Sequence, residues 1–129
     1  MAEQKNQCNS GYTLVSLEQL LVILKEESNR PVLVACLHEG EEWQQLTDDL
    51  QTVAERFAGR LLVLAVNCTR ESESTDRLGL LGTPTYVMYA AGREVGRLIG
   101  RADPPSLISL AGTVLATSES RDEPRNVSI

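Results

Sequence analysis

The sequence predicts an α/β fold in which a mixed central sheet, made of a parallel βαβ half and an antiparallel hairpin, is flanked by helices on both faces. Two observations carry this prediction. The runs Val32–Leu37 and Leu61–Val66 are continuously apolar, as is typical of parallel strands covered on both faces, and a helical pattern lies between them. Farther along the chain, two strand-like segments flank the dipeptide Ala91-Gly92, which favours a tight hairpin turn.

Composition indicates one globular domain with a hydrophobic core. The chain has 129 residues, a net charge of −6 and 42% hydrophobic residues, and domains typically contain roughly 100–200 residues. We expect a loose segment over 1–11, the domain over 12–116 and a disordered tail over 117–129. The acidic charge disfavours nucleic acid as a partner. No apolar run approaches the ~20 residues that cross a bilayer, so no membrane partner is expected either.

The termini and the cysteines favour a cytoplasmic location. The first residues, MAEQKNQCNS, lack the charged and then apolar pattern of a secretory signal peptide. The three cysteines, at positions 8, 36 and 68, are widely spaced and odd in number. They therefore do not form a disulfide framework, and they suit a reducing compartment.

The first half of the chain is predicted to contain a short strand, a helix and the central strand. Tyr12–Val15 is the strand candidate. Ser16 and Gln19 have the spacing of a capping box, which predicts a helix over Leu17–Glu27. Val32–Leu37 follows as a buried strand.

The longest apolar helical pattern predicts a helix over about Glu41–Ala58. Its large side chains recur at helical spacing, and acidic and amide residues occupy the other face. Burying five such side chains contributes roughly 7–15 kcal/mol, so packing decides this element. The apolar positions are Trp43, Leu46, Leu50, Val53, Ala54 and Phe57.

The second half is predicted to complete the sheet and to add two helices. Strands are expected at Leu61–Val66, Tyr86–Ala90 and Glu94–Ile99. A short helix over Ser74–Leu81 is expected to turn Leu78 and Leu81 inward. Asp103 is predicted to cap a last helix, with Pro104 at its first position.

This order of elements and several local strings resemble thioredoxin over about residues 12–116. The segment Gly82-Thr83-Pro84-Thr85, followed by a strand, a turn and a second strand, is the most specific. The resemblance implies the thioredoxin fold and a cis bond before Pro84, which would present the backbone of Thr83 to an extended peptide. The other strings that carry it are Pro31–Leu37, Leu50–Gly59, Leu62–Asn67 and Leu80–Thr85.

The sequence departs from the family at the place of its redox chemistry. Thioredoxins carry two cysteines, separated by two residues, at the start of the long helix, where the helix end lowers the pKa of the first thiol. Here the corresponding stretch is His38–Trp43, with Gly40 and Trp43 at the cysteine positions. Ala35 replaces the buried acid of the family, and Asp48 replaces the proline that kinks the helix. We therefore expect no catalytic residue and no classical disulfide reductase activity.

These features predict a redox-inactive, thioredoxin-like domain that binds a protein or an extended peptide at the Pro84 face, as an adaptor or a chaperone-like protein. Trp43 either fills the core or lies beside Thr83-Pro84 as the anchor of a groove. A negative rim would favour basic or apolar peptides. A monomer or weak homodimer is expected, and dimerisation through the Trp43 face is a further alternative. The expected binding residues are Trp43, Thr83, Pro84, Glu41, Glu42 and His38.

The alternative is a thiol-dependent protein of cell redox homeostasis that uses Cys36, Cys68 or both. The two cysteines lie at the ends of strands expected to be adjacent, about 4.8 Å apart, so the thiols could be neighbours. They could equally be two small buried hydrophobic residues. A metal site made of His38, Cys36 and the nearby carboxylates matches no dense ligand pattern. Neither a metal nor another cofactor is predicted.

Overall fold

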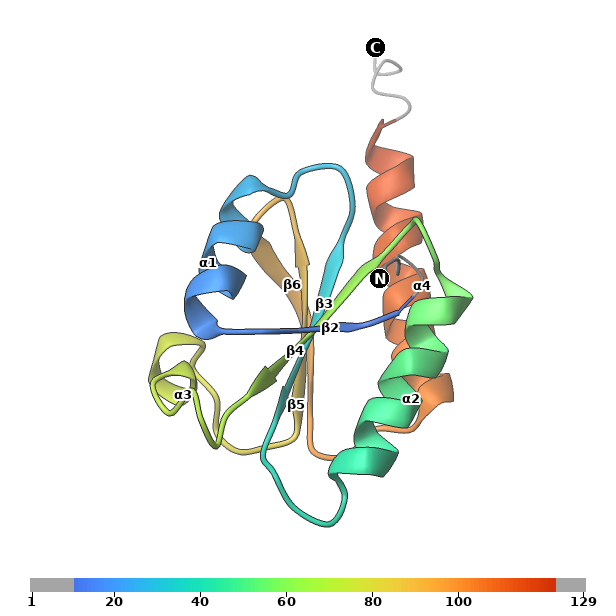
Figure 1. The fold of residues 1–129 in the computed structure, drawn as a ribbon. Helices are drawn as coiled ribbons and strands as arrows, with labels where there is room; N and C mark the ends of the chain where they lie inside the picture. Colours follow the sequence, from blue (N-terminus) through green and yellow to red (C-terminus); the bar gives the residue numbers. More distant parts are fainter. Residues whose placement is uncertain (1–10, 123–129) are drawn as a thin grey trace, which may run out of the picture.

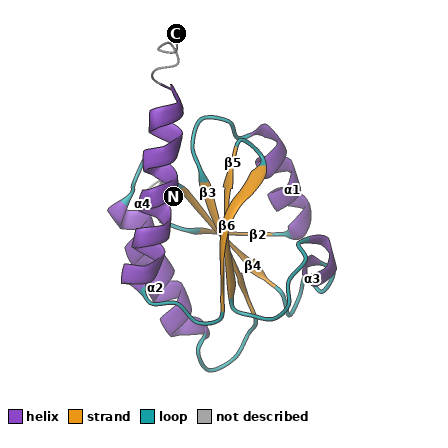
Figure 2. Ribbon diagram, turned by 180° about the vertical axis from the view of Figure 1, so that it is seen from behind, coloured by secondary structure: helices purple, strands orange, loops and turns teal. Residues whose placement is uncertain are grey.

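The computed structural model describes residues 11–122. Residues 1–10 of the predicted loose segment, which include Cys8, and residues 123–129 of the predicted tail lie outside the described residues. A five-stranded sheet in the order β2-β4-β3-β5-β6 forms the middle layer, with α1 and α3 on one face and α2 and α4 on the other (Figures 1 and 2). The predicted mixed α/β fold is confirmed. The elements are β2 (Thr13–Val15), α1 (Leu17–Glu26), β3 (Val32–Leu37), α2 (Trp43–Arg56), β4 (Leu62–Asn67), α3 (Ser74–Arg77), β5 (Thr85–Ala90), β6 (Arg93–Ile99) and α4 (Pro104–Asp122).

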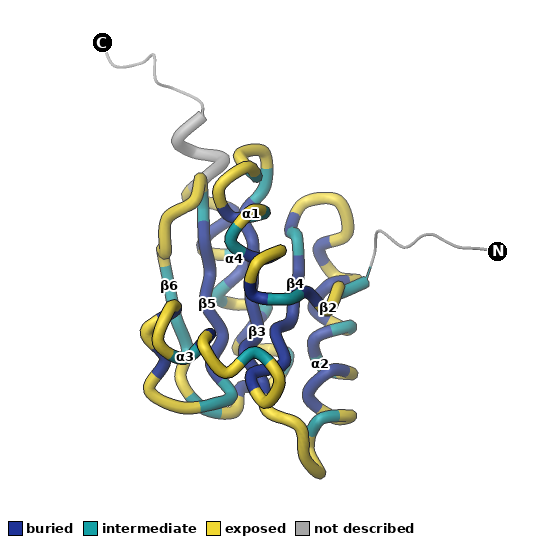
Figure 3. The backbone as a smooth tube through the Cα atoms, turned by 60° about the vertical axis from the view of Figure 1, so that its left-hand side comes forward, coloured by how far each residue is buried: buried dark blue, intermediate teal, exposed yellow. Residues whose placement is uncertain are grey.

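Strand β3 lies at the centre of the sheet, where it pairs in parallel with β4 and antiparallel with β5. All six of its residues are buried (Figure 3). Alternate side chains enter two separate cores. Leu33, Ala35 and Leu37 pack with α2 and α4, whereas Val32, Val34 and Cys36 pack with α1 and the segment around α3.

The helices begin where the sequence supplies partners for their first amides. The capping box before α1 is confirmed, because the Gln19 amide donates to Ser16 Oγ at 3.1 Å and the Ser16 amide donates to Gln19 Oε1 at 2.8 Å. Before α4, the Ser106 amide donates to Asp103 Oδ1 at 3.1 Å, and Pro104 is the first helical residue. Helix α2 starts at Trp43 rather than at Glu41, because the preceding residues form a turn.

The structure differs from the sequence predictions on both sides of the hairpin. Helix α3 ends at Arg77, and Gly79 has a φ of 66° that takes the chain out of the helix. Leu78 is buried as expected, but Leu81 is 87% exposed, so its predicted inward position is wrong. Leu81 lies beyond the helical periodicity on which that prediction depended.

Helix α4 is longer than predicted, and it takes up part of the expected tail. It continues to Asp122, past residue 117 where the tail was expected to start. The sequence between Thr113 and Asp122 contains neither proline nor glycine, and Pro124 is the next residue that disfavours a helix. Among the described residues, no helix has the length and apolar character needed to cross a bilayer.

The β5–β6 turn contains a residue in a conformation that alanine tolerates poorly. Ala91 has a φ of 54° and Gly92 a φ of 81°, and two positive φ values are typical of the hairpin turn that favours Asn-Gly. We predict that Ala91→Asn raises the free energy of unfolding by about 1 kcal/mol, because the left-handed region costs alanine roughly that much. Urea denaturation measures this change.

Gly92→Ala is the matched control for the same turn. It should lower the free energy of unfolding, because its φ is positive and a Cβ atom there would lie 3.1 Å from the Leu24 carbonyl oxygen. Equal stability of the Ala91→Asn protein and the parent would contradict the proposed strain.

Candidate functional site

Four loops meet at the edge of the sheet where the parallel strands β3 and β4 end. Three contacts join them: the His38 ring bonds the Thr83 hydroxyl, the Glu39 amide donates to Thr69 Oγ1 at 2.9 Å, and the Arg101 guanidinium lies 3.3 Å from Glu42. We call this region the cis-proline edge, and it comprises residues 38–43, 67–70, 81–84 and 100–101. Sites in α/β proteins commonly lie at such an edge.

The Thr83–Pro84 peptide bond is cis. Hydrogen bonds on both sides hold this segment: the Gly100 amide donates to the Pro84 carbonyl at 2.8 Å, and the Thr85 hydroxyl donates to the Gly82 carbonyl at 2.6 Å. Thr83 and Pro84 are themselves half-buried. The edge therefore presents a fixed backbone segment that remains partly open to solvent.

Trp43 is neither fully buried in the core nor fully exposed at the edge, the two alternatives that the sequence leaves open. It is the first residue of α2, it is half-buried, and it packs against the core cluster on the α2 and α4 side of the sheet. Its amide donates to the Gly40 carbonyl at 3.2 Å. Part of the side chain thus stabilises the core while part of it remains accessible at the cis-proline edge.

Leu81 belongs to this edge and not to the core, where the helical pattern predicts it. At 87% exposure it is the most exposed large hydrophobic side chain of the described residues. The neighbouring Leu80 is only 6% exposed. Two adjacent leucines in an irregular loop rarely both point inward, and this was the signal in the sequence that could have identified Leu81.

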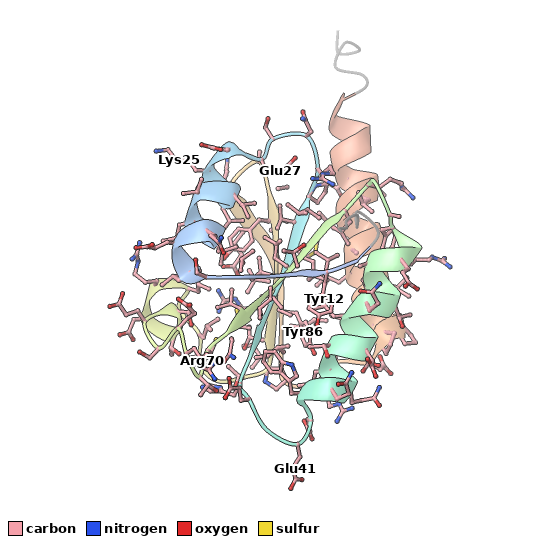
Figure 4. All side chains as sticks on the ribbon, in the orientation of Figure 1. Tyr12, Lys25, Glu27, Glu41, Arg70 and Tyr86 are labelled. Carbon is pink, nitrogen blue, oxygen red and sulfur yellow. The ribbon has the colours of Figure 1, made fainter. Side chains whose placement is uncertain are left out.

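The acidic side chains of the edge are largely paired with basic and amide groups. Glu39 Oε2 accepts from Asn67 Nδ2 at 2.7 Å and from Arg70 Nε at 2.8 Å. The Asn67 hydrogen bond and then Arg70 lower the pKa of Glu39 below its ordinary value. Glu42 pairs with Arg101, whereas Glu41 is exposed and points away from the molecule (Figure 4). The expected negative rim is therefore weaker than the sequence suggested.

The two described cysteines lie on the other face of the sheet and contact each other. Cys36 is fully buried and Cys68 is 2% exposed, and both side chains belong to one core cluster. The neighbouring Cys68 thiol, together with burial, raises the pKa of Cys36. The Cys36 thiol and the Ser74 hydroxyl lower the pKa of Cys68, whereas burial opposes this shift. The structure thus brings together two thiols of unequal acidity.

In residues 11–122, no three histidine, cysteine, aspartate or glutamate side chains gather in a way that could hold a metal ion. The imidazole of His38 is directed to Thr83 and the carboxylate of Glu39 to Asn67 and Arg70, whereas Cys36 lies in the opposite core.

Comparison with known proteins agrees with the topology. No family model matches the chain. A thioredoxin from Alicyclobacillus acidocaldarius subsp. acidocaldarius is 33% identical over 51 residues, which are 40% of this chain and 49% of that protein, so the match spans about half the length of this curated relative. A mutant thioredoxin from Halobacterium salinarum NRC-1 has a TM-score of 0.71 at 21% identity, over 84% of this chain and 95% of its own. The chain has the thioredoxin fold.

Two further solved structures extend the likeness in fold. Spinach chloroplast thioredoxin f has a TM-score of 0.70 at 19% identity, over 81% of this chain and 93% of its own. Thioredoxin f2, solved in complex with ferredoxin:thioredoxin reductase, has a TM-score of 0.72 at 15% identity, over 81% and 96% of the two chains.

In β3, an apolar residue occupies the position at which the resemblance to thioredoxin implies a buried acid. Ala35 is fully buried in β3 and lies opposite Tyr86 of β5. The Tyr86 hydroxyl is buried, and among the described groups it has no hydrogen-bond partner. Burial raises the pKa of Tyr86. This side of the sheet therefore holds a weak acid that burial keeps neutral rather than a carboxylate.

We predict that Asn67→Ala raises the pKa of Glu39 toward its ordinary 4.5. The lowered pKa means that the Glu39 contacts stabilise the fold above the ordinary pKa and lose this effect as the pH falls through the lowered value. NMR titration of the Glu39 carboxyl carbon measures the shift. Arg70→Ala is the control with the smaller expected change, and a larger change there would contradict the leading role of Asn67.

Proposed function

We propose that this thioredoxin-like chain binds a protein or an extended peptide at the cis-proline edge without redox catalysis, as an adaptor or a chaperone-like protein. The observation that carries the proposal is the exposed Leu81 two residues before the cis Thr83–Pro84 bond. A cytoplasmic location and a monomer or weak homodimer form part of the same proposal.

Apolar contact would supply the main free energy of binding at this edge. Burying a fully exposed leucine side chain contributes about 1.5–3 kcal/mol, and Leu81 is almost fully exposed. The half-buried Trp43 offers further apolar surface that is already ordered by the core. Because the Thr83–Pro84 segment is held by hydrogen bonds, a bound chain would order little of the protein itself.

The charge pattern favours an apolar peptide over a strongly basic one. Arg70 pairs with Glu39 and Arg101 with Glu42. A basic ligand would have to compete with these arginines, whereas an apolar side chain over Leu81 leaves both pairs intact. The thioredoxin f2 structure, a complex with ferredoxin:thioredoxin reductase, supports the idea that this fold can present a surface to a protein partner.

The start of α2 supports a binding role rather than exchange of disulfides. Disulfide exchange at this position needs a thiolate, and the residues from His38 to Trp43 contain no cysteine. Glu42, the residue before the helix, makes no side-chain capping bond. The edge therefore offers a ligand the Glu41 carboxylate, the His38 imidazole and the Trp43 indole, but no thiol.

Selection from a library of random extended peptides, with the purified chain as bait, would test the proposal. We predict that the selected peptides are rich in apolar residues, and that Leu81→Ser weakens their binding at least about tenfold in calorimetry, as loss of an interface hot spot does. Trp43→Ala should also weaken binding, although part of that effect comes from the core.

Val22→Ser is the matched control, because Val22 is 53% exposed on α1, away from the edge. It should leave the affinity unchanged. Equal losses for the Leu81 and Val22 variants, or unchanged binding in the Leu81 variant, would contradict binding at the cis-proline edge.

A second candidate function is a thiol-dependent redox role. The contact between the Cys36 and Cys68 thiols favours it, because two neighbouring thiols of unequal acidity are the minimum set for reversible oxidation. In a Cys8→Ser background, this function predicts that iodoacetamide labels Cys68 in the native protein faster at pH 7 than it labels an unfolded thiol. Labelling of both thiols only after unfolding, as judged by mass spectrometry, would exclude the redox role.

A further inference from the structure

We propose that Cys36 and Cys68 form a peroxide-reactive pair, in which Cys68 attacks a hydroperoxide and Cys36 then closes an internal disulfide beneath the α3 segment. The α3 segment is defined here as residues 69–80. This inference rests on the second candidate function and is independent of peptide binding at the cis-proline edge.

The pairing of β3 with β4 places the two sulfurs together. Cys36 lies opposite Val66 in the parallel register, and Cys68, two residues farther along, points to the same face because side chains alternate along a strand. The Cys68 amide donates to the Leu37 carbonyl at 2.7 Å, so the chain stays against β3 beyond the last strand residue. Both side chains lie in the same buried cluster, and closing a disulfide bond of about 2.05 Å requires the strand end that carries Cys68 to move toward Cys36.

The surroundings give the two thiols different roles. Cys68 lies at the end of its strand, and its sulfur is 3.2 Å from the Ser74 hydroxyl. The neighbouring Cys36 thiol and the Ser74 hydroxyl lower the pKa of Cys68, and a lower pKa raises the thiolate fraction at neutral pH. Cys36 is fully buried within β3 and retains its proton. Cys68 is therefore the attacking group, and Cys36 is the resolving group.

The reaction balances with a hydroperoxide as the oxidant. The Cys68 thiolate attacks one peroxide oxygen, the O–O bond breaks, and the other oxygen leaves with a proton as water or an alcohol. The Cys36 sulfur then attacks the sulfur of the Cys68 sulfenic acid. The S–O bond breaks, the S–S bond forms, and the released hydroxide leaves as water with the Cys36 proton. Two thiols are oxidised and one hydroperoxide is reduced.

The α3 segment covers the pair with Leu78 and Leu80, which pack in the same core cluster, and a few polar contacts also fasten it. The Arg97 guanidinium donates to the carbonyls of Leu78 and Gly79, each at 2.9 Å, and the Leu17 amide donates to Glu71 Oε1 at 3.1 Å. The segment contains only four helical residues and is mostly exposed (Figure 3). A short, mostly exposed segment with two buried leucines opens locally at a lower free energy than the core, and such an opening admits a small peroxide to Cys68.

Treatment of the full Cys8→Ser chain with equimolar hydrogen peroxide tests the proposal. Samples are quenched with iodoacetamide at intervals and analysed by intact mass and peptide mapping. The expected product has lost two hydrogens, has no alkylated cysteine and yields one peptide pair joined through Cys36 and Cys68. When Cys36→Ser is combined with Cys8→Ser, the reaction should stop at a Cys68 sulfenic acid that dimedone traps. When Cys68→Ser is combined with Cys8→Ser instead, oxidation should slow at least about tenfold.

The substitution Arg97→Met, in the same Cys8→Ser background, tests whether the α3 segment limits access of peroxide to Cys68. Loss of the two carbonyl hydrogen bonds should speed disulfide formation about three- to tenfold, because these bonds help to hold the α3 segment closed over Cys68. Arg93→Met, an exposed position on the same strand β6, should leave the rate unchanged. Circular dichroism confirms that each variant is folded before treatment.

The possible failures separate the two proposals. If iodoacetamide labels Cys68 in the native protein but peroxide yields no internal disulfide, the peroxide pair is overturned and the broader redox role stands. If neither thiol reacts before unfolding, both are overturned. If Cys68→Ser is oxidised at Cys36 as fast as the parent, the assignment of roles is wrong.

Discussion

Burial of β3 on both faces is the constraint on which the rest of this structure depends. Because every residue of the strand is buried, each side chain is committed to one of two cores. A slip of one residue would exchange the two sets and place Cys36 among the contacts of α2 and α4. The same constraint brings His38, the residue after the strand, to the exposed edge beside Thr83. One buried element therefore positions both the cis-proline edge and the thiol pair.

The alternation along β3 also separates this chain from the redox chemistry of the thioredoxins that it resembles. Ala35 faces α2 and α4, on the side where the resemblance places a buried acid, and it offers no proton acceptor there. The sulfur appears one residue later, which places it on the opposite face and away from the start of α2. Thiol chemistry in this chain would thus use a different face of the sheet, with Ser74 and the α3 segment as its surroundings rather than a helix N-terminus.

Local patterns in the sequence were sufficient for most of the fold and for only part of the site. The apolar run of β3, the capping box at Ser16 and the periodicity of α2 are local signals, and the structure has all three. The predicted inward position of Leu81 is wrong because the chain leaves the helix at Gly79, so the helical periodicity does not reach Leu81. The bonds from Arg97 to the α3 segment join residues far apart in sequence. Such contacts leave no pattern of residue spacing in the sequence, because they form only when the sheet brings the two segments together.

The end of β4 connects the two regions through consecutive residues. The side chain of Asn67 holds Glu39 at the cis-proline edge, and the next residue, Cys68, contacts Cys36 in the opposite core. Successive side chains of a strand point to opposite faces, so a displacement of this strand end moves both. The Cys68 amide is itself bonded to the Leu37 carbonyl, which precedes His38. A disulfide bond between Cys36 and Cys68 would therefore act on the backbone beside Leu37, where the loop from His38 to Glu42 begins. Its effect on that loop would pass through neighbouring residues only.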